Sequence, residues 1–267
     1  MFCSKFAQGQ QELSVATFNI RYANPNDTLR WEDRNDEVAD AVRYFDIIGF
    51  QEVLPGQKDD LIDRMPRHGH FGSGRDRDAR GEACPIFWNK KRFDLLHGEV
   101  RWLSDTPTEP GSISPSADLP RIVTIVLLFD LQTGKTVRVL NTHWSHSSNE
   151  ARLDASSLMA GWTGWAGKAD LTLVCGDFNA EPDSEPITHL LESADLKDTY
   201  EKANFRCRNS FGTYTTFFPS NFMAATRIDA IFYRGNVSVD WVCADELMKY
   251  GVYISDHLPY HAIFKIR

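Results

Sequence analysis

The segment DLTLVCGDFN, residues 170–179, joins an apolar run to a pair of polar side chains. Residues 170–175 have the apolar, β-branched character of a buried strand. Asp177 and Asn179 follow two residues apart, so in an extended chain both side chains point in the same direction. Because strand ends are common places for chemistry, we predict a functional acid–amide pair here.

The rest of the chain alternates between apolar, strand-like segments and amphipathic ones with helical spacing. Strands are predicted at residues 13–20, 46–51, 84–88, 121–130, 136–142, 170–175, 227–233, 237–244 and 260–266. Helices are predicted at residues 33–45, 57–65, 150–166 and 184–194, and a loop at residues 70–81. Long hairpin strands mixed with helices favour one layered α/β domain, in which two packed, largely antiparallel sheets are flanked by helices.

Composition limits the functional classes. The 267 residues are 42% hydrophobic and 25% charged, which is typical of a globular protein with a large core. The net charge of −8 disfavours a protein that coats nucleic acid, because phosphate neutralisation needs a basic surface. The apolar stretches are all far shorter than the roughly 20 residues of a membrane helix, so we predict no transmembrane span.

The five cysteines are widely spread and form no CxxC pair, which makes a structural zinc site improbable. We predict that Cys84, Cys175 and Cys243 are small buried hydrophobes. Residues 1–11 are expected to be a disordered segment ahead of a domain at residues 12–267. Small residues near position 8 would also fit the end of a clipped signal peptide, so both an exported and a cytoplasmic location stay open.

Polar residues stand at the ends of several other predicted strands. They are Asn19 and Arg21, Glu52, His143, Asp229, and the pair Asp256 and His257. Taken singly, each is more often structural: a satisfied amide, a solvated acid or a hydrogen-bonded histidine. Their repetition at successive strand ends favours a single site at one edge of the sheets.

The ordered motifs TFNIR (17–21), QE (51–52), GE (81–82), NTHW (141–144), GDFN (176–179), RIDAIF (227–232) and SDH (255–257) resemble those of the endonuclease/exonuclease/phosphatase family. The resemblance covers residues 13–267 and is strongest to bacterial members of undefined substrate. It implies a four-layered α/β sandwich of the deoxyribonuclease I type. It also implies Mg²⁺-assisted hydrolysis of a phosphoester by in-line attack of water.

The resemblance also implies roles for individual residues. Glu52 and Asn19 match ligands of Mg²⁺, with Mn²⁺ as the alternative ion, and Asp256 matches a second metal or metal-water ligand. Asp177 matches the group that orients or deprotonates the attacking water, and Asn179 would stabilise the charge on the phosphoryl group.

The two histidines are expected to work with carboxylate partners. The resemblance pairs His257 with Asp229 and His143 with Glu82, so that each histidine binds phosphoryl oxygens. Arg121 matches a phosphate-contacting arginine. Arg21 is a further phosphate-binding candidate, and so are Arg75, Arg77 and Arg80. The alternative for these four arginines is that they are solvated surface charges.

Three functions stay open at this stage. The leading hypothesis is a monomeric phosphodiesterase or phosphatase acting on a small or exposed phosphoester. The second is a nuclease acting on DNA or RNA, for which the loop at 72–80 is the one candidate for contacting the nucleic acid. Phe71, Trp102 and Trp144 are predicted to be buried rather than to stack on bases. The third is an inactive binding module, which would typically lack at least one of the acids, amides or histidines present here.

Overall fold

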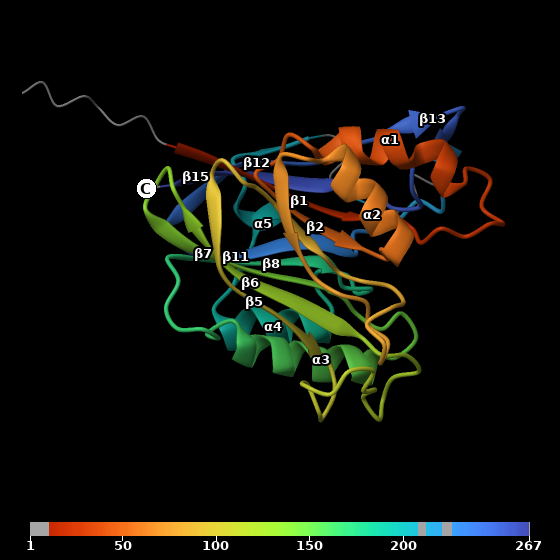
Figure 1. Cartoon of the computed structure of the whole chain (residues 1–267). Coiled ribbons are helices and arrows are strands. Elements are labelled where there is room, and N and C mark those ends of the chain that lie inside the picture. Colours follow the sequence, from red (N-terminus) through yellow and green to blue (C-terminus); the bar gives the residue numbers. More distant parts are fainter. Residues whose placement is uncertain (1–10, 208–211, 221–225, 267) are drawn as a thin grey trace, which may run out of the picture.

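The computed structural model describes residues 11–207, 212–220 and 226–266. Two large sheets lie face to face, and each carries a pair of helices on its outer side, giving four layers (Figure 1). The expected four-layered α/β sandwich is therefore confirmed. Residues 1–10 of the expected disordered segment (1–11) lie outside the described residues, whereas its last residue, Gln11, pairs with Ile266 in the first sheet.

The first sheet has seven strands in the order β10-β12-β15-β1-β2-β4-β3. These strands are β1 (Gln11–Asn19), β2 (Ile47–Gln51), β3 (His68–Phe71), β4 (Ile86–Asn89), β10 (Phe205–Arg206), β12 (Val237–Ala244) and β15 (Tyr260–Ile266). Helices α1 (Trp31–Val42) and α2 (Pro55–Arg64) cover its outer face.

The second sheet has six strands in the order β5-β6-β7-β8-β11-β9. These strands are β5 (Phe93–Trp102), β6 (Ile122–Asp130), β7 (Lys135–His143), β8 (Leu171–Asp177), β9 (Lys197–Asp198) and β11 (Asp229–Gly235). Helices α3 (Asn149–Trp162) and α4 (Glu185–Ala194) cover its outer face. The remaining elements are the short helix α5 (Thr199–Lys202) and the hairpin of β13 (Met248–Lys249) with β14 (Val252–Tyr253).

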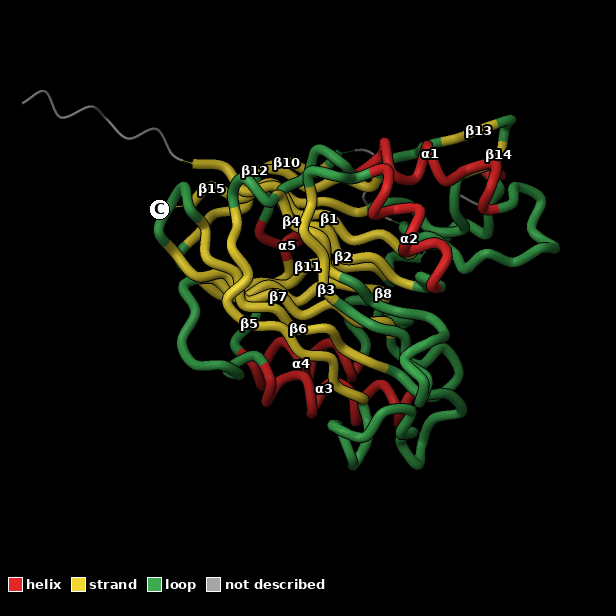
Figure 2. Tube along the Cα trace, in the orientation of Figure 1, coloured by secondary structure: helices red, strands yellow, loops and turns green. Residues whose placement is uncertain are grey.

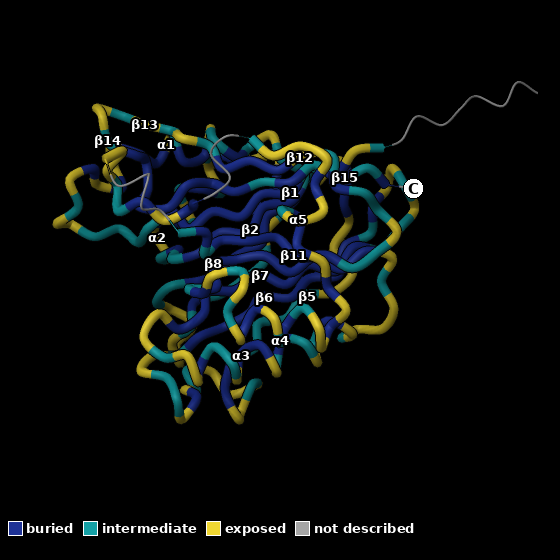
Figure 3. The backbone as a smooth tube through the Cα atoms, turned by 180° about the vertical axis from the view of Figure 1, so that it is seen from behind, coloured by how far each residue is buried: buried dark blue, intermediate teal, exposed yellow. Residues whose placement is uncertain are grey.

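Apolar side chains fill the three spaces between the four layers. Val15, Ile47 and Leu173 belong to the cluster between the two sheets, Phe18 to the cluster under α1 and α2, and Met159 to the cluster under α3 and α4. The strands are accordingly buried along most of their length, while the exposed residues gather on loops and outer helix surfaces (Figure 3). None of the helices in the described residues is long and apolar enough to cross a membrane.

Every predicted strand and helix corresponds to an element of the structure, but six strands are not predicted: β3, β5 and the two-residue strands β9, β10, β13 and β14. β3 falls partly in the predicted loop, and β5 was overlooked altogether. β5 lies at the edge of its sheet and is buried only at its two ends, Phe93 and Trp102. An edge strand that is largely exposed lacks the continuous apolar run by which the other strands were recognised.

Cys243 is buried, as predicted, but it also forms a disulfide that the sequence analysis did not predict. Its partner is Cys207, and the bond links β12 to the segment after β10. Cys84 and Cys175 are free and buried, as predicted.

Candidate active site

Strand register brings the polar strand ends together at one end of the sandwich. β1 and β2 run parallel with Asn19 opposite Gln51, and β7 and β8 run parallel with His143 opposite Asp177. The antiparallel strand β11 begins with Asp229, opposite Asp177. The loops that follow these strands gather at the same end (Figure 2).

Buried polar contacts fix the two sheets against each other beneath the site. The Gln51 side-chain amide donates to Oδ1 of Asn141, and the Asn141 amide donates to the carbonyl oxygens of Phe50 and Pro85. A Cβ atom on Gly49 would lie 2.6 Å from Asn141 Oδ1, so glycine allows this close approach. Asn141 of the NTHW motif is therefore a structural residue that sets the relative position of the sheets.

Asp177 contacts several other residues of the site. Its side chain is buried and accepts hydrogen bonds from the Asn179 backbone amide at 2.9 Å and from Asn19 Nδ2 at 2.9 Å. Its Oδ2 also lies 3.5 Å from Nε2 of His143 and 3.6 Å from Nε2 of His257. Burial raises the pKa of Asp177 to about 7, and only part of that rise is offset by His257. A carboxylate with this pKa can both accept and release a proton near neutral pH.

His257 and Asp229 make the contact that the sequence predicts. Nδ1 of His257 lies 2.7 Å from Oδ2 of Asp229, and both groups are buried. Burial alone would lower the pKa of His257, but the carboxylates of Asp229 and Asp177 outweigh it and raise the pKa well above its ordinary value. The ring is therefore held as a cation beside Asp177.

His143 and Glu82 do not form the contact that the resemblance implied. Glu82 instead accepts a two-pronged hydrogen bond from Arg75, at 2.9 and 3.0 Å. A planar guanidinium matches a carboxylate better than one ring nitrogen does, which explains the exchange of partner. Burial and the nearby charges of Arg121 and His257 lower the pKa of His143 well below its ordinary value, so this ring is neutral.

Glu52 and Asp256 form the acidic end of the site. Glu52 Oε2 accepts a hydrogen bond from the Tyr22 backbone amide at 3.0 Å, and Asp256 Oδ2 lies 3.6 Å from Nη1 of Arg21. Burial raises the pKa of Asp256, since charge is less stable away from water. Arg21 is also paired with Asp27, so most of its charge is already compensated.

Asn19 lies between this acidic end and Asp177, but with the opposite orientation to the one expected. Its Oδ1 accepts a hydrogen bond from the Arg21 backbone amide, and its Nδ2 donates to Glu52 at 3.0 Å and to Asp177. In this structure Asn19 therefore donates to both carboxylates, and its role as an oxygen ligand of a metal ion stays a prediction. Arg21, Glu52 and Asn179 all have positive φ, between 47° and 60°, a backbone conformation that non-glycine residues rarely adopt away from functional sites.

The residues at the acidic end suit a hard divalent cation. The carboxylates of Glu52 and Asp256 supply the oxygen atoms that Mg²⁺ and Mn²⁺ prefer, and both line the same cleft. Asp177, Asp229 and His257 also bring possible ligand atoms within 4.8 Å of one another. A protonated imidazole has no lone pair to offer, however, so these three residues fit a proton relay better than a metal site.

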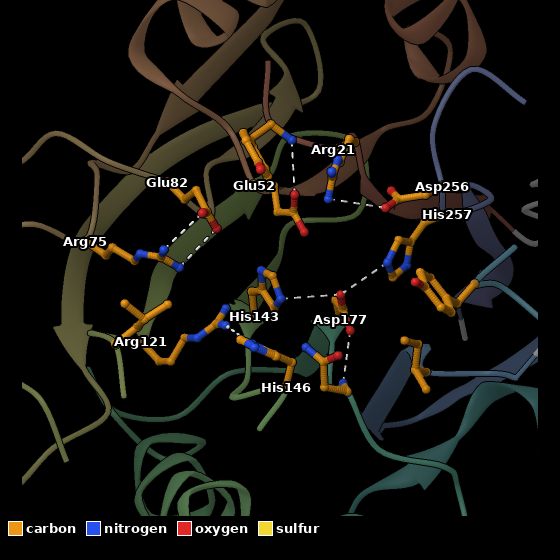
Figure 4. A pocket seen from close by; sticks show the side chains of 15 residues that line it. Arg21, Glu52, Arg75, Glu82, Arg121, His143, His146, Asp177, Asp256 and His257 are labelled. Carbon is orange, nitrogen blue, oxygen red and sulfur yellow. Dashed lines mark hydrogen bonds and ion pairs between the residues drawn. The ribbon is translucent and has the colours of Figure 1, made fainter. Parts of the chain in front are cut away.

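Arginine and histidine side chains form the opposite, cationic end. The cleft has a volume of about 390 Å³, and Arg75, Arg121, His143 and His146 line the end facing away from Asp256 (Figure 4). Arg121 is only 7% exposed, and its Nη2 donates to Nδ1 of His146 at 3.1 Å.

The other two arginines of the candidate loop lie outside the cleft. The side chains of Arg77 and Arg80 are 85% and 79% exposed, so the interpretation as a solvated loop holds for them. Trp102 and Trp144 are buried as predicted, and Phe71 is partly buried.

His146 and Tyr214 are among the cleft residues that the sequence analysis does not predict. His146 follows the NTHW motif by two positions, and a second histidine so close to the first was the available signal. The ring of Tyr214 lies 5.0 Å from the ring of His257 and borders the cleft. Its segment, between two predicted elements, carried no recognisable pattern.

Comparisons with known proteins show the family and the fold. The sequence model of the endonuclease/exonuclease/phosphatase family matches residues 16–257. A family protein from Bacteroides vulgatus, known as a crystal structure, is 31% identical with a TM-score of 0.91, over 97% of this chain and 100% of that chain. No curated protein matches the sequence significantly.

Two further structures are similar to this chain. The mannosyl-6-phosphatase of Bacteroides thetaiotaomicron is 29% identical with a TM-score of 0.88, over 95% of this chain and 100% of that chain. TDP2 of D. rerio, complexed with a single-strand DNA product, is 19% identical with a TM-score of 0.75, over 96% of this chain and 100% of that chain. At that identity the second similarity concerns the fold alone.

Proposed function

The chain belongs to the endonuclease/exonuclease/phosphatase family, and from this premise we propose that it is a divalent-metal-dependent hydrolase of a small or exposed phosphoester. One observation carries the proposal. A single cleft places the acidic pair Glu52 and Asp256, the buried Asp177 beside cationic His257, and the buried Arg121 around one space. A phosphoester, a divalent cation and an attacking water need these three kinds of neighbour.

Asp177 is the group that receives a proton from the attacking water. Its pKa of about 7 leaves a large fraction of the carboxylate ionised at neutral pH, and a base of that strength suits proton transfer at that pH. Asn19 and the Asn179 backbone amide hold the carboxylate in place by hydrogen bonds. His257, kept protonated by Asp229, supplies a positive charge for the phosphoryl oxygens.

Glu52 and Asp256 are the residues that would hold the metal ion. When bound, a divalent cation neutralises phosphoryl charge and stabilises the leaving oxygen. Asn179 donates one amide hydrogen to the Trp144 carbonyl oxygen, which fixes the amide and leaves its other hydrogen for a phosphoryl oxygen.

Several observations support a small substrate over a nucleic acid. The net charge of −8 opposes a polyanion, and Arg77 and Arg80 are exposed and do not line the cleft. Trp102 and Trp144 are buried, so neither is available to stack on a base. The similarity to a mannosyl-6-phosphatase supports sugar phosphates as the first candidates to assay. An inactive module is disfavoured, since Glu52, Glu82, Asp177, Asp256 and both histidines line the cleft and Asp229 contacts His257 behind it.

A substrate survey tests this proposal. Purified protein is incubated with mannose 6-phosphate, glucose 6-phosphate, a nucleoside monophosphate and single-stranded DNA, each with Mg²⁺, with Mn²⁺ and with EDTA. We expect metal-dependent release of phosphate from at least one small substrate, no release in EDTA, and little DNA cleavage. Cleavage of DNA at the lowest enzyme concentration, with the small substrates untouched, would establish the nuclease alternative instead.

A further inference from the structure

A second group of metal-ligating side chains lies on the outer face of the first sheet. Possible ligand atoms of Cys243, Asp245 and His261 lie within 4.8 Å of one another. Cys207 belongs to the same group, because its sulfur atom is bonded to that of Cys243. None of these four residues lines the cleft, so the group is separate from the candidate active site.

Strand register places Cys243 and His261 side by side. β12 and β15 are adjacent antiparallel strands, with Cys243 opposite His261 (Figure 1). The residues that flank them, including Val242 and Ala262, pack between the two sheets. Because successive side chains of a strand point to opposite faces, the sulfur atom and the imidazole both point outward.

Backbone pairing brings Asp245 and Cys207 to the same place. Asp245 follows Cys243 by two positions, so an extended chain turns both side chains to one face. Its backbone amide donates to the Pro259 carbonyl oxygen at 3.1 Å, which continues the pairing beyond the end of β12. On the other side, β10 runs parallel to β12, and the Cys207 backbone amide donates to the Val242 carbonyl oxygen at 3.0 Å. Three chain segments thus present their side chains to one point.

His261 offers a ring nitrogen that no hydrogen bond occupies. Its Nδ1 is buried and lies 3.3 Å from Oδ2 of Asp245, yet it has no hydrogen-bond partner among the described residues. His257 differs, since its Nδ1 lies 2.7 Å from Asp229 in a hydrogen bond. A buried polar nitrogen without a partner is costly, and a metal ion is a partner that would remove this cost. The ring of Phe45 packs 4.9 Å from the imidazole and restricts its movement.

The ligand types in this group suit zinc. Thiolate sulfur, imidazole nitrogen and carboxylate oxygen are the three ligands that Zn²⁺ takes in proteins. The two cysteines are 36 residues apart, whereas a CxxC pattern detects only cysteines that are close in sequence. A site assembled from separate strands is therefore invisible to the spacing criterion that disfavoured zinc in the sequence.

The disulfide decides whether the sulfur atoms are available. A metal ion binds thiolates and not the sulfur atoms of a disulfide. A dithiol reductant transfers two electrons and two protons to Cys207 and Cys243 and is itself oxidised to a disulfide. The two cysteines then carry thiols, and binding of Zn²⁺ releases their two protons to the solvent.

We propose that the reduced protein binds one Zn²⁺ ion through Cys207, Cys243, Asp245 and His261. Four protein ligands complete a closed, tetrahedral site of the structural type. With Zn–S at about 2.3 Å and Zn–N at about 2.1 Å, tetrahedral ligand atoms lie roughly 3.3–3.8 Å apart, so atoms already within 4.8 Å need only a small contraction. The ion would link β12, β15 and the segment after β10 in the reduced protein. Binding of the metal alone tests this site, independently of the proposed hydrolase function.

Metal titrations of the oxidised and reduced protein give the first test. The protein is reduced with dithiothreitol, desalted without oxygen and titrated with Co²⁺, which reports thiolate ligands by a charge-transfer band, and then with Zn²⁺. The oxidised protein is the matched control, because it keeps Glu52 and Asp256 of the cleft. We expect the reduced protein to bind one more equivalent than the oxidised protein, with the thiolate band. Equal binding by the two forms, or extra binding without the band, would overturn the inference.

Variants that keep both cysteines identify the other two ligands. We expect Asp245→Asn and His261→Gln each to weaken Zn²⁺ binding by the reduced protein at least about 10-fold, since loss of even an outer partner of a ligand costs that much. The Asp245 side chain is 35% exposed, so Asp245→Asn decides if His261→Gln does not fold. Wild-type affinity in a folded Asp245→Asn protein would contradict the proposed ligand set.

Cys84 is the thiol that a competing site would use, because it lines a recess beside Glu52 and His143. We expect Cys84→Ala to keep the extra equivalent and the thiolate band. Loss of the band in Cys84→Ala, with the band retained in Asp245→Asn, would place the metal at the cleft and overturn the inference.

Thiol alkylation gives an independent measurement. The reduced protein is treated with iodoacetamide with and without Zn²⁺, and each modified cysteine is identified by mass spectrometry. Since a metal-bound thiolate is a weaker nucleophile than a free one, we expect Zn²⁺ to slow alkylation of Cys207 and Cys243 by about 10-fold. The same protection should be lost in Asp245→Asn. Alkylation of both cysteines at an unchanged rate in saturating Zn²⁺ would contradict the proposal.

Discussion

The two ends of the cleft differ in how their charges are compensated. At the acidic end, the Glu52 carboxylate accepts hydrogen bonds from N–H donors. The Asp256 carboxylate has a long ion pair, with its Oδ2 3.6 Å from Nη1 of Arg21. At the other end, Arg121 is buried, and no carboxylate of the described residues pairs with it. One end therefore lacks a cation and the other an anion, and a metal ion together with a phosphate supplies both. Asp177 lies between the two ends, where the attacking water would be activated.

Removal of the central carboxylate should give the largest effect. We expect Asp177→Asn to lower kcat by on the order of 10³-fold, because the amide cannot accept the proton of the attacking water. Steady-state hydrolysis of p-nitrophenyl phosphate with Mg²⁺ measures the change. Asp183→Asn, an exposed aspartate on a nearby loop, is the control. A fully active, folded Asp177→Asn protein would show that another group is the base.

Glu52→Gln should separate the two ends of the cleft. The substitution removes one negative charge from the acidic end, so we expect the Mg²⁺ concentration needed for half-maximal activity to rise about 10- to 100-fold. Glu82→Gln is the matched comparison, since Glu82 lies at the cationic end and is bound to Arg75. We expect it to leave the Mg²⁺ requirement unchanged. Equal shifts in the two variants would remove the distinction between the ends.

The contacts that hold the sheets in register should affect stability more than catalysis. A methyl group at Gly49 would press on Asn141 and Cys175, both within 2.8 Å of the added Cβ. We expect Gly49→Ala to lower the free energy of unfolding by about 1–3 kcal/mol. Urea denaturation followed by circular dichroism measures the loss. An unchanged unfolding midpoint would mean that the space between the sheets adapts freely.

The smallest effect is a dependence of stability on pH at a histidine far from the cleft. His68 is buried; its Nε2 lies 3.2 Å from the Phe45 carbonyl oxygen, and its Nδ1 has no partner. Burial lowers the pKa of His68 from its ordinary value of 6.5. As the pH falls below 6.5, the unfolded chain takes up a proton that the folded chain resists, so stability decreases.

His68→Phe removes this contribution. Unfolding free energies at pH 7.5 and pH 5.5 should therefore differ less in the variant than in the wild type. The measurement at pH 7.5, where the histidine is neutral in both states, is the internal control. A pH dependence as steep as that of the wild type would assign the effect to other groups.

Sequence patterns predicted the buried strands because an apolar run surrounded by polar residues has a local signature. The same patterns placed Asp177 at a strand end, where the structure has it, and His257 ahead of the last strand, where it lies in the loop before β15. The exposed edge strand β5 was missed because its burial is set by its place in the sheet. Cys207 and Cys243 are 36 residues apart, and nothing in that spacing marked them as partners.

The sequence predicted which residues lie at the site better than it predicted which of them contact each other. The residues expected at the cleft from the motifs line it or stand behind those that do. The predicted pairing of Glu82 with His143 is wrong, because Arg75 binds Glu82 instead. Arg75 comes from a loop whose path no local sequence pattern indicates. The amide orientation of Asn19 depends on the backbone amide of Arg21, which folds back through a positive φ.

The most direct test of this account is a crystal structure of the protein grown with Mn²⁺ and inorganic phosphate, with anomalous scattering used to locate the metal. We predict a metal peak at the carboxylates of Glu52 and Asp256, and a phosphate between that metal and Arg121. A metal peak within the Asp177, Asp229 and His257 cluster, or a phosphate bound outside the cleft, would contradict the division of the cleft into a cation-binding end and an anion-binding end.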